Sequence, residues 1–349
     1  MSDFFSLSIS AVKQLTPNSV SVEFEIPENL SETFIHIPGQ YVTLKHMIGD
    51  SEIRRAYSIC STPNSENFSV GIKKVKDGSF SVYANESLKV GDAIDVMAPE
   101  GHFKHQPISE ASNHYMAIAA GSGITPILSI IGATLDGEPT SKFVLLYGNQ
   151  SLEETMFHNA LEGLKQQYPG RFQIEYIFSR KKEENGLQGR IDRSVVNYLL
   201  KNKLADYNFD KFFLCGPEEM INVVSETLTD RGISKDQILF ELFTTSEEGV
   251  LTEAHEGNTK ITLIVDDETE HFVMDQKNSV LQAALDQGLD VPYSCQGGIC
   301  SSCIARVTEG KVEMRKNQIL TDDELAEGLV LTCQSHPTTP TLIVDYDDV

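Results

Sequence analysis

Hydrophobic and polar positions follow three different patterns along the chain. In residues 1–105, short alternating runs such as YVTLKH, RAYSI and FSVGIKKV are separated by turn-forming residues. No long segment of this part repeats at the helical spacing of 3.6 residues. Closely spaced short strands of this kind are typical of small antiparallel barrels. We therefore predict an antiparallel β-barrel for residues 1–105.

Strand-like apolar runs alternate with amphipathic helices in residues 106–245. The runs HYMAIAA, FVLLYGN, FQIEYIFS, FFLCG and ILFELF are separated by helical segments such as PILSIIGATL and PEEMINVVSETLTDRG. A capping box formed by Ser151 and Glu154 predicts that the helix SLEETMFHNALEGLKQQY begins there. This alternation predicts an α/β domain, in which helices cover both faces of a parallel sheet.

The remaining residues read as a linker and a third, smaller domain. Residues 246–259 are polar, acidic and without periodicity, which is typical of a linker. Within residues 260–349, ITLIVDD and HFVMD can pair as a hairpin, and SVLQAALDQG has helical spacing with Gly288 as its stop. Residues 260–349 are therefore predicted to form a small α+β domain. A length of 349 residues is consistent with a multidomain chain.

The chain is strongly acidic, with 28 Lys and Arg against 51 Asp and Glu and a net charge of −23. A field of this sign repels nucleic acid and anionic membrane surfaces, so neither is expected as a partner. Residues 251–349 alone carry 18 acidic and 6 basic side chains, which would steer this part toward a basic surface of a partner protein. The sequence has no apolar run of about 20 residues and no signal-peptide pattern at its start, so we expect a cytoplasmic protein.

Four of the six cysteines gather near the end of the chain, whereas Cys60 and Cys215 stand alone. The spacing C-x4-C-x2-C, with a fourth cysteine further on, is that of plant-type [2Fe–2S] ligation. Gly297 and Gly298 let the backbone wrap closely, with its N–H groups toward the sulfurs. A structural zinc site remains the alternative, although such sites usually present two C-x2-C pairs and this sequence has one. The candidate metal ligands are Cys295, Cys300, Cys303 and Cys333.

The segments PYSCQGGICSSCIARVTEGKVEM and LTCQS resemble the plant-type ferredoxin family. This resemblance covers nearly all of residues 260–349. It implies a β-grasp ferredoxin domain in which the four clustered cysteines are the ligands of the cluster.

A glycine-rich turn follows the first strand of the α/β part, in the segment GSGITP. Glycine allows a pyrophosphate to approach the backbone, the helix N-terminus offers unpaired N–H groups, and proline suits a first helical turn. Taken alone, the pattern also fits any tight strand-to-helix turn. The candidate nucleotide-binding residues are Gly121, Gly123, Thr125 and Pro126.

A second motif, Cys215-Gly216-Pro217, follows the strand FFL and opens another helix. Together the two motifs resemble the nicotinamide-binding half of the ferredoxin–NADP reductase superfamily. The resemblance implies that Cys215 lies near the nicotinamide ring as a catalytic residue, while a buried core thiol is the alternative. Glu241 in FELF could line the same site, or it could be an ordinary carboxylate of an edge strand.

A basic segment, Ser179-Arg180-Lys181-Lys182, follows the strand FQIEYIF, and Arg190 comes shortly after it. The 2′-phosphate that distinguishes NADPH from NADH needs a positively charged receptor. A solvated turn is the alternative, because two glutamates follow directly. We favour NADPH over NADH, since a Ser-Arg pair at this place also resembles the NADP-selective members of the superfamily.

The barrel part carries the segment Arg55-Ala56-Tyr57-Ser58, which resembles the RxYS flavin motif of the same superfamily. The resemblance implies that the arginine pairs with the flavin phosphate, the tyrosine packs along the flavin, and the catalytic serine bonds near N5. A second phosphate-contacting turn is matched by Gly78, Ser79 and Ser81. Cys60 stands where many relatives have a hydroxyl residue, so we expect a hydrogen bond to be weakened there. The histidines show no metal-ligand spacing.

Combining the three cofactors has a chemical reason. A nicotinamide releases two electrons as a hydride and an iron–sulfur cluster accepts one, and a flavin can connect the two. The order of the domains resembles the reductase components of bacterial multicomponent oxygenases that have a C-terminal ferredoxin. The segment GIKKVKDGSFSVYANESLKVGDAIDVMAPEGHF resembles the phenylacetyl-CoA epoxidase branch of these reductases, which implies FAD rather than FMN.

The resulting hypothesis is an NADPH-dependent FAD/[2Fe–2S] oxidoreductase that passes single electrons to a partner oxygenase. The sequence contains no carboxylate-rich di-iron helix, so the oxygen chemistry is expected on a separate protein. Other acceptors, such as a desaturase, a ring-hydroxylating oxygenase or a hybrid-cluster protein, remain open. A zinc-stabilised binding module without enzymatic activity is the alternative of a different class.

Overall fold

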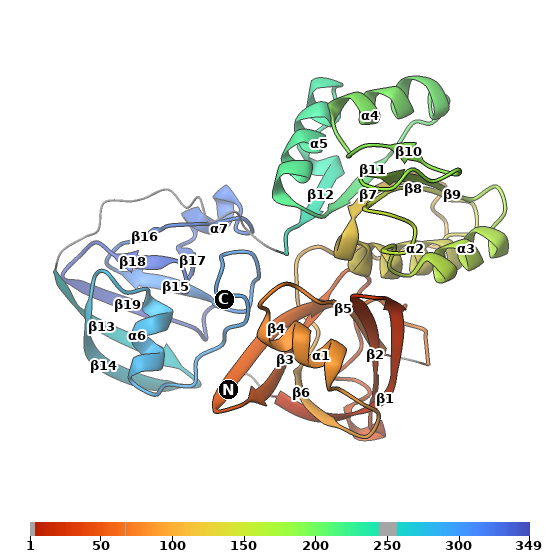
Figure 1. Ribbon diagram of the computed structural model, residues 1–349. Coiled ribbons are helices and arrows are strands. Elements are labelled where there is room, and N and C mark those ends of the chain that lie inside the picture. Colours follow the sequence, from red (N-terminus) through yellow and green to blue (C-terminus); the bar gives the residue numbers. More distant parts are fainter. Residues whose placement is uncertain (1–3, 67, 244–256) are drawn as a thin grey trace. The chain divides into compact units, whose positions relative to one another are not determined.

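The computed structural model describes residues 4–66, 68–243 and 257–349 (Figure 1). It divides into two compact units, of which the larger contains Phe5–Ile53 and Tyr57–Phe243 and the smaller contains residues 257–349 together with Phe4 and Arg54–Ala56. The larger unit thus joins the first two of the three predicted domains. Most of the predicted linker lies outside the described residues, and its last part, predicted as linker up to residue 259, already belongs to a strand that begins at Asn258.

The first part of the larger unit is a six-stranded sheet with the order β4-β3-β6-β1-β2-β5. Its paired strands are antiparallel where the register is given, as in β1 with β2 and β3 with β6. The sheet curls so that Ile59, directly after β4, forms a bridge with Val70 of β5. The predicted antiparallel barrel is therefore confirmed as a curled sheet, a half-barrel. The strands are β1 (Phe4–Thr16), β2 (Ser19–Glu25), β3 (Tyr41–Ile48), β4 (Ser51–Ser58), β5 (Phe68–Lys73) and β6 (Ala93–Met97), with a 3-10 turn η1 (Glu28–Leu30).

Helix α1 (Ser79–Glu86) in this part was not predicted. Gly78 is its N-cap, so the residues predicted as a phosphate-contacting turn lie at the beginning of a helix. The helix has eight residues, of which only Phe80, Ser81 and Ala84 are buried. It therefore lacks the long apolar repeat by which a helix is recognised in a sequence.

The second part of the larger unit is a parallel sheet with the order β10-β9-β8-β7-β11-β12. Helices cover both of its faces, α2 and α3 on one and α4 and α5 on the other (Figure 1). The predicted α/β class is confirmed. The strands are β7 (His114–Ala120), β8 (Lys142–Asn149), β9 (Phe172–Phe178), β10 (Leu187–Gln188), β11 (Lys211–Cys215) and β12 (Ile238–Glu241). The helices are η2 (Gly121–Gly123), α2 (Ile124–Gly137), α3 (His158–Gln167), α4 (Arg193–Tyr198), its π-helical continuation η3 (Leu199–Lys203), α5 (Glu218–Asp230) and η4 (Lys235–Gln237).

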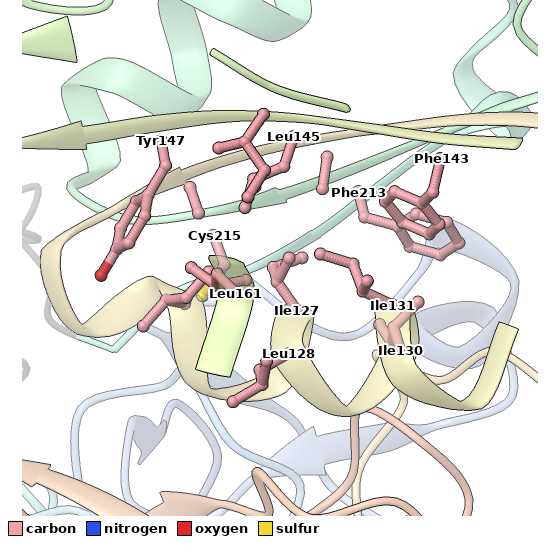
Figure 2. Packing of buried hydrophobic residues seen from close by; sticks show 14 of the residues in the cluster. Ile127, Leu128, Ile130, Ile131, Phe143, Leu145, Tyr147, Leu161, Phe213 and Cys215 are labelled. Carbon is pink, nitrogen blue, oxygen red and sulfur yellow. The ribbon is translucent and has the colours of Figure 1, made fainter. Parts of the chain in front are cut away.

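Helix α2 is the centre of the larger unit. One side of it packs on the sheet, where Ile127 and Ile131 meet Phe143, Leu145 and neighbouring side chains (Figure 2). Its other side packs against the loop after β4. There the Ser129 hydroxyl donates to the carbonyl oxygen of Ser61 at 2.7 Å, and a Cβ on Gly132 would lie 2.6 Å from Cγ2 of Thr62. Because α2 is packed from both sides, the barrel and the parallel sheet form one body.

Helix α3 begins at His158, so the helix start predicted at Ser151 was wrong. Phe157, the residue before the helix, has a left-handed backbone conformation with φ 57°. A Cβ on Gly71 of β5 would lie 2.9 Å from the Phe157 ring, which shows how closely this ring packs on the barrel. The Glu154 carboxylate accepts a hydrogen bond from Nδ2 of Asn18 instead of closing a capping box. Contacts with a distant strand thus override the local capping signal.

The smaller unit is an α+β fold, as predicted. Its main sheet has the order β14-β13-β19-β15-β17, and β13 and β14 form the predicted antiparallel hairpin. Helix α6 packs on this sheet through Val280, Leu281 and Ala284, and Gly288 follows it with φ +76°. The elements are β13 (Asn258–Val265), β14 (Glu268–Asp275), α6 (Val280–Asp286), β15 (Ile304–Glu309), β16 (Val312–Met314), α7 (Asp322–Ala326), β17 (Leu329–Leu331), β18 (Ser335–Pro337) and β19 (Thr341–Asp345). Across the described parts of both units, no helix has the length and apolar character needed to cross a membrane.

Candidate functional site

The two glycine motifs of the nucleotide domain meet at the point where the order of the parallel strands reverses. Strand β7 leads into Gly121–Gly123, and the neighbouring β11 ends at Cys215. A Cβ on Gly123 would lie 2.1 Å from the carbonyl oxygen of Cys215, so this position accepts only glycine without a backbone shift. Ligands of open α/β sheets bind at such a switch point, beyond the carboxyl ends of the strands. The structure therefore brings both predicted motifs together at the expected place.

The first loop is held in shape by its own side chains. Gly121 has φ +56°, and the Thr125 hydroxyl donates to the carbonyl oxygen of Ser122 at 3.0 Å. Thr125 and Pro126 are both buried in the first turn of α2. Gly216 is also closely packed, because a Cβ there would lie 2.7 Å from Cε of Met220 and 3.1 Å from Cβ of Ala120. The loop thus presents backbone at a helix N-terminus, which is suited to a phosphate group.

Lys73 is a residue of this site that the sequence interpretation missed. It ends strand β5 of the barrel, and its Nζ lies 3.6 Å from the place of a Cβ on Gly121. Its ammonium group thus adds positive charge beside the loop, where an anion would be stabilised. The run GIKKVKDG, directly before the predicted flavin turn, was the available signal, but the sequence does not tell which lysine faces the loop.

Ser58, Cys215 and Glu241 come together from the two halves of the larger unit. Strands β11 and β12 place Cys215 beside Glu241, and the Ser58 hydroxyl at the end of β4 donates to Oε2 of Glu241 at 3.2 Å. Burial raises the pKa of the Glu241 carboxyl to about 8. Burial, and to a lesser extent the negative charge of Glu241, raises the pKa of the Cys215 thiol well above its usual range. Cys215 also belongs to the hydrophobic core, beside α2 (Figure 2).

The predicted flavin motif lies on β4, and the alternation of the strand puts Arg55 and Tyr57 on one face. Arg55 is exposed, and its Nη1 donates to the carbonyl oxygen of Arg54 at 2.7 Å. The Tyr57 ring is half-buried, 5.6 Å from the ring of Phe80 in α1. Ala56 is also half-buried, whereas Ser58 is buried. The Tyr57 face of this strand can therefore pack against a large planar ring.

The second predicted phosphate turn is compact. The Ser81 hydroxyl accepts a hydrogen bond from the backbone N–H of Val75 at 3.2 Å, so this side chain helps to hold the turn. A Cβ on Gly78 would lie 2.5 Å from Oγ of Ser81, and Ser79 is the first residue of α1. The three predicted residues therefore form a single tight helix start.

The hydrogen bond expected to be weakened at Cys60 is present. The Cys60 thiol donates to the carbonyl oxygen of Ser69 at 3.3 Å and lies 3.2 Å from the Ser69 hydroxyl. Burial raises the pKa of this thiol to about 12, and the side chain belongs to the hydrophobic cluster around α2.

The basic segment lies at the carboxyl edge of the same parallel sheet. The backbone N–H groups of Arg180 and Lys181 donate to the carbonyl oxygen of Gln150 at 3.0 and 3.1 Å, and Ser179 is held in the same way by Asn149. The side chains of Arg180 and Arg190 are exposed, while Lys181 lies 3.9 Å from the Glu183 carboxylate. The backbone of the segment is thus fixed to the end of β8, and its positive charge faces outward.

The four clustered cysteines of the smaller unit form two pairs. A hydrogen bond with Cys300 lowers the pKa of Cys295 to about 6, and a hydrogen bond with Cys303 lowers the pKa of Cys333. Among the residues that the structure describes, no three His, Cys, Asp or Glu side chains gather as they would around one metal ion. Two pairs of thiols fit a centre in which four thiolates hold two irons.

The loop around these cysteines wraps as the glycines suggested. The backbone N–H of Gly297 donates to Sγ of Cys295 at 3.3 Å. Gly298 has φ +71°, and a Cβ there would lie 2.8 Å from the carbonyl oxygen of Lys316. Gln334, which the sequence interpretation did not include, follows Cys333, and its Nε2 donates to the carbonyl oxygen of Gln296 at 2.9 Å. Residues next to the first and the last cysteine are thereby tied together.

Three protein-family models match consecutive parts of the chain. The oxidoreductase FAD-binding domain matches residues 6–105, and the oxidoreductase NAD-binding domain matches residues 117–226. The 2Fe-2S iron-sulfur cluster binding domain matches residues 263–338. These matches coincide with the half-barrel, the parallel sheet and the smaller unit.

Known proteins of similar sequence match this chain over nearly its full length. One of the components of 1,2-phenylacetyl-CoA epoxidase from Escherichia coli is 40% identical over 99% of both chains. The ferredoxin reductase component of 3-ketosteroid-9-alpha-monooxygenase from Mycobacterium tuberculosis is 30% identical, over 98% of this chain and 96% of the relative.

Solved structures share the fold. Phthalate dioxygenase reductase, described as a modular structure for electron transfer from pyridine nucleotides to [2Fe-2S], matches with a TM-score of 0.59 and 22% identity over 98% of both chains. An intact type IV self-sufficient cytochrome P450 monooxygenase matches with a TM-score of 0.71 and 20% identity, over 98% of this chain and 41% of that one. The chain therefore belongs to the family of FAD- and NAD-binding oxidoreductases that carry a C-terminal plant-type [2Fe–2S] ferredoxin domain.

Proposed function

We propose that this chain oxidises NADPH and passes the electrons singly, through FAD and the [2Fe–2S] cluster, to an oxygenase of the phenylacetyl-CoA epoxidase type. The observation that carries the proposal is the hydrogen bond between Ser58 of the half-barrel and Glu241 of the parallel sheet, directly beside Cys215. It joins the flavin-binding and nucleotide-binding halves at one point, where a hydride could pass between their ligands.

Bound FAD would supply the conversion of a hydride into single electrons, and the cluster would supply a one-electron carrier. The residues of the chain have the tasks of binding and orientation. We assign the pyrophosphate of the nucleotide to the Gly121–Gly123 loop, with Lys73 beside it, and the flavin to the segment Arg55–Ser58 and the start of α1. Cys215 and Pro217 would bound the nicotinamide, and the buried, protonated thiol of Cys215 would exclude water there without adding charge.

The raised pKa of Glu241 leads to a pH-dependent stability. Its folded-state pKa of about 8 lies above the usual value of 4.5, so its contribution is fully present below about pH 4.5 and is lost as the pH rises through 8. Between pH 5 and 8.5, the free energy of unfolding measured in urea should fall by about 4 kcal/mol more for the wild type than for Glu241→Gln. Glu226→Gln, a change of an exposed carboxylate, should keep the wild-type dependence. Parallel pH profiles of wild type and Glu241→Gln would contradict the assignment.

The choice of NADPH rests on Arg180. A guanidinium–phosphate contact contributes about 1.5–3 kcal/mol, so Arg180→Ala should raise KM for NADPH about tenfold or more and change KM for NADH less than about twofold. Steady-state kinetics with both nucleotides measure this. Arg193→Ala removes an exposed arginine that pairs with Asp230 and Glu226 in the same domain, and it should change neither KM. An equal change in both KM values for Arg180→Ala would remove the 2′-phosphate assignment.

The oxygenase partner is supported by the 40% identity to a component of a phenylacetyl-CoA epoxidase. The direct test is turnover of the reconstituted system. With NADPH and this chain, the oxygenase component of a phenylacetyl-CoA epoxidase should oxidise its substrate, whereas a 3-ketosteroid monooxygenase component should respond weakly. Equal or stronger stimulation of the second system would overturn the choice of partner and leave the electron-transfer chain in place.

A further inference from the structure

Tyr346 has a buried hydroxyl group that is connected to the cysteine cluster. The residue follows β19 and is 6% exposed, and its Oη lies 2.9 Å from Oγ1 of Thr332. Thr332 is completely buried and directly precedes Cys333. The contact therefore reaches the backbone beside the last of the four cysteines.

The donor and the acceptor of each hydrogen bond between Tyr346, Thr332 and Cys303 can be assigned from the chemistry of the groups. The Thr332 hydroxyl donates to the carbonyl oxygen of Cys303 at 3.0 Å, and the backbone N–H of Thr332 donates to the same oxygen at 3.1 Å. A carbonyl oxygen only accepts, so the single proton of the Thr332 hydroxyl is committed to Cys303. Tyr346 must then be the donor to Thr332.

This arrangement connects the final strand to both members of one cysteine pair. The backbone N–H of Tyr346 donates to the carbonyl oxygen of Ile264 on β13 at 2.9 Å, which fixes the position of the tyrosine. From there the bonds run through Thr332 to the peptide group of Cys303, while Thr332 is covalently joined to Cys333. Tyr346, Thr332 and both cysteines are buried, where hydrogen bonds polarise one another and unmade ones are costly.

We propose that Tyr346 is a positioning residue of the iron–sulfur centre, which acts through Thr332 to fix the Cys303 peptide and the spacing of the Cys303–Cys333 pair. Groups that orient metal ligands without contacting the metal commonly affect both the retention of the metal and the electronic properties of the metal centre. The proposal concerns the smaller unit alone and does not depend on the nucleotide or the oxygenase partner.

The experiment compares holoprotein of the wild type, Tyr346→Phe and Thr332→Val. Tyr346→Phe keeps the ring and removes only the donor, so iron release to a chelator should become about fivefold faster, as expected for one lost buried hydrogen bond. The EPR spectrum of the reduced cluster and its reduction potential should also change. Thr332→Val should have a larger effect, and adding Tyr346→Phe to it should have little further effect. Thr332→Ser, which keeps the hydroxyl, should behave as the wild type.

A matched control separates this role from general stability. Thr259 is another fully buried hydroxyl of the same unit, which donates to the carbonyl oxygen of Thr339 at 2.6 Å, away from the cysteines. Thr259→Val should lower the thermal stability and leave the EPR spectrum unchanged. The proposal is overturned if Tyr346→Phe matches the wild type in iron release and EPR spectrum, or if Thr259→Val changes the EPR spectrum as much. If Tyr346→Phe does not fold, the contrast between Thr332→Ser and Thr332→Val decides by the same criteria.

Discussion

Cys300→Ser is expected to abolish electron delivery to one-electron protein acceptors while NADPH oxidation continues. Cys300 is buried and forms one thiol pair with Cys295, so its replacement removes one of four ligands from a two-iron centre. Cytochrome c reduction should fall by at least about two orders of magnitude, because loss of a group that merely supports a metal ligand already costs about 10–100-fold. Ferricyanide reduction, which the flavin can serve directly, should stay within about twofold of the wild type, because Tyr57, Ser58 and the start of α1 lie in the other unit.

Iron content, the visible spectrum and the two acceptor assays measure this effect. Cys60→Ser is the matched control, because Cys60 is a buried cysteine whose bond to the Ser69 carbonyl a hydroxyl can also make. This control should retain iron and both activities. If Cys300→Ser lost ferricyanide and cytochrome c reduction together, the proposed division of labour between the two units would be wrong.

Gly123→Ala should strongly impair reduction of the flavin by NADPH. The added Cβ would lie 2.1 Å from the carbonyl oxygen of Cys215, a distance that forces the two nucleotide-binding loops apart. A displacement of about 1 Å in a hydride-transfer site costs about 100-fold in rate. Stopped-flow absorbance of the flavin after mixing with NADPH gives the rate directly. Reduction of the same variant by dithionite should proceed as in the wild type, because it does not use the nucleotide site.

Gly163→Ala provides the control for the added methyl group. Gly163 lies in α3, and a Cβ there would have no atom within 4 Å. The change should leave flavin reduction unaffected and stabilise the helix by up to about 1 kcal/mol. Normal flavin reduction in Gly123→Ala would show that the contact between the two loops is not needed for productive binding.

Much of the fold could be predicted because its signals are local. The GSG and CGP motifs that follow strands, the hairpin of β13 and β14, and the spacing of the four cysteines are each contained in short segments of sequence. The structure places the two glycine motifs against each other, and the cysteines form two pairs. The roles of these residues stay predictions, which the variants above test.

What could not be predicted depends on contacts between distant segments. The late start of α3 results from the packing of Phe157 on Gly71, which is far away in sequence. Lys73 faces the Gly121 loop from the end of another sheet, and Glu241 meets Ser58 across 183 positions of the chain. Tyr346 and Gln334 support the cysteine loops through bonds that no motif records. The residues around such partners form no recognisable motif, so only the three-dimensional arrangement identifies them.

The packing of α2 between the half-barrel and the parallel sheet has a consequence for how such proteins can be recombined. Ser129 is bonded to Ser61, and Gly132 leaves no room beside Thr62, so both halves share one interface. A chimera that exchanges only one half must recreate this interface, whereas the cysteine-bearing unit has a separate hydrophobic core. In related genes, domain fusions and losses should therefore occur at the boundary after the nucleotide-binding half far more often than between the half-barrel and the parallel sheet.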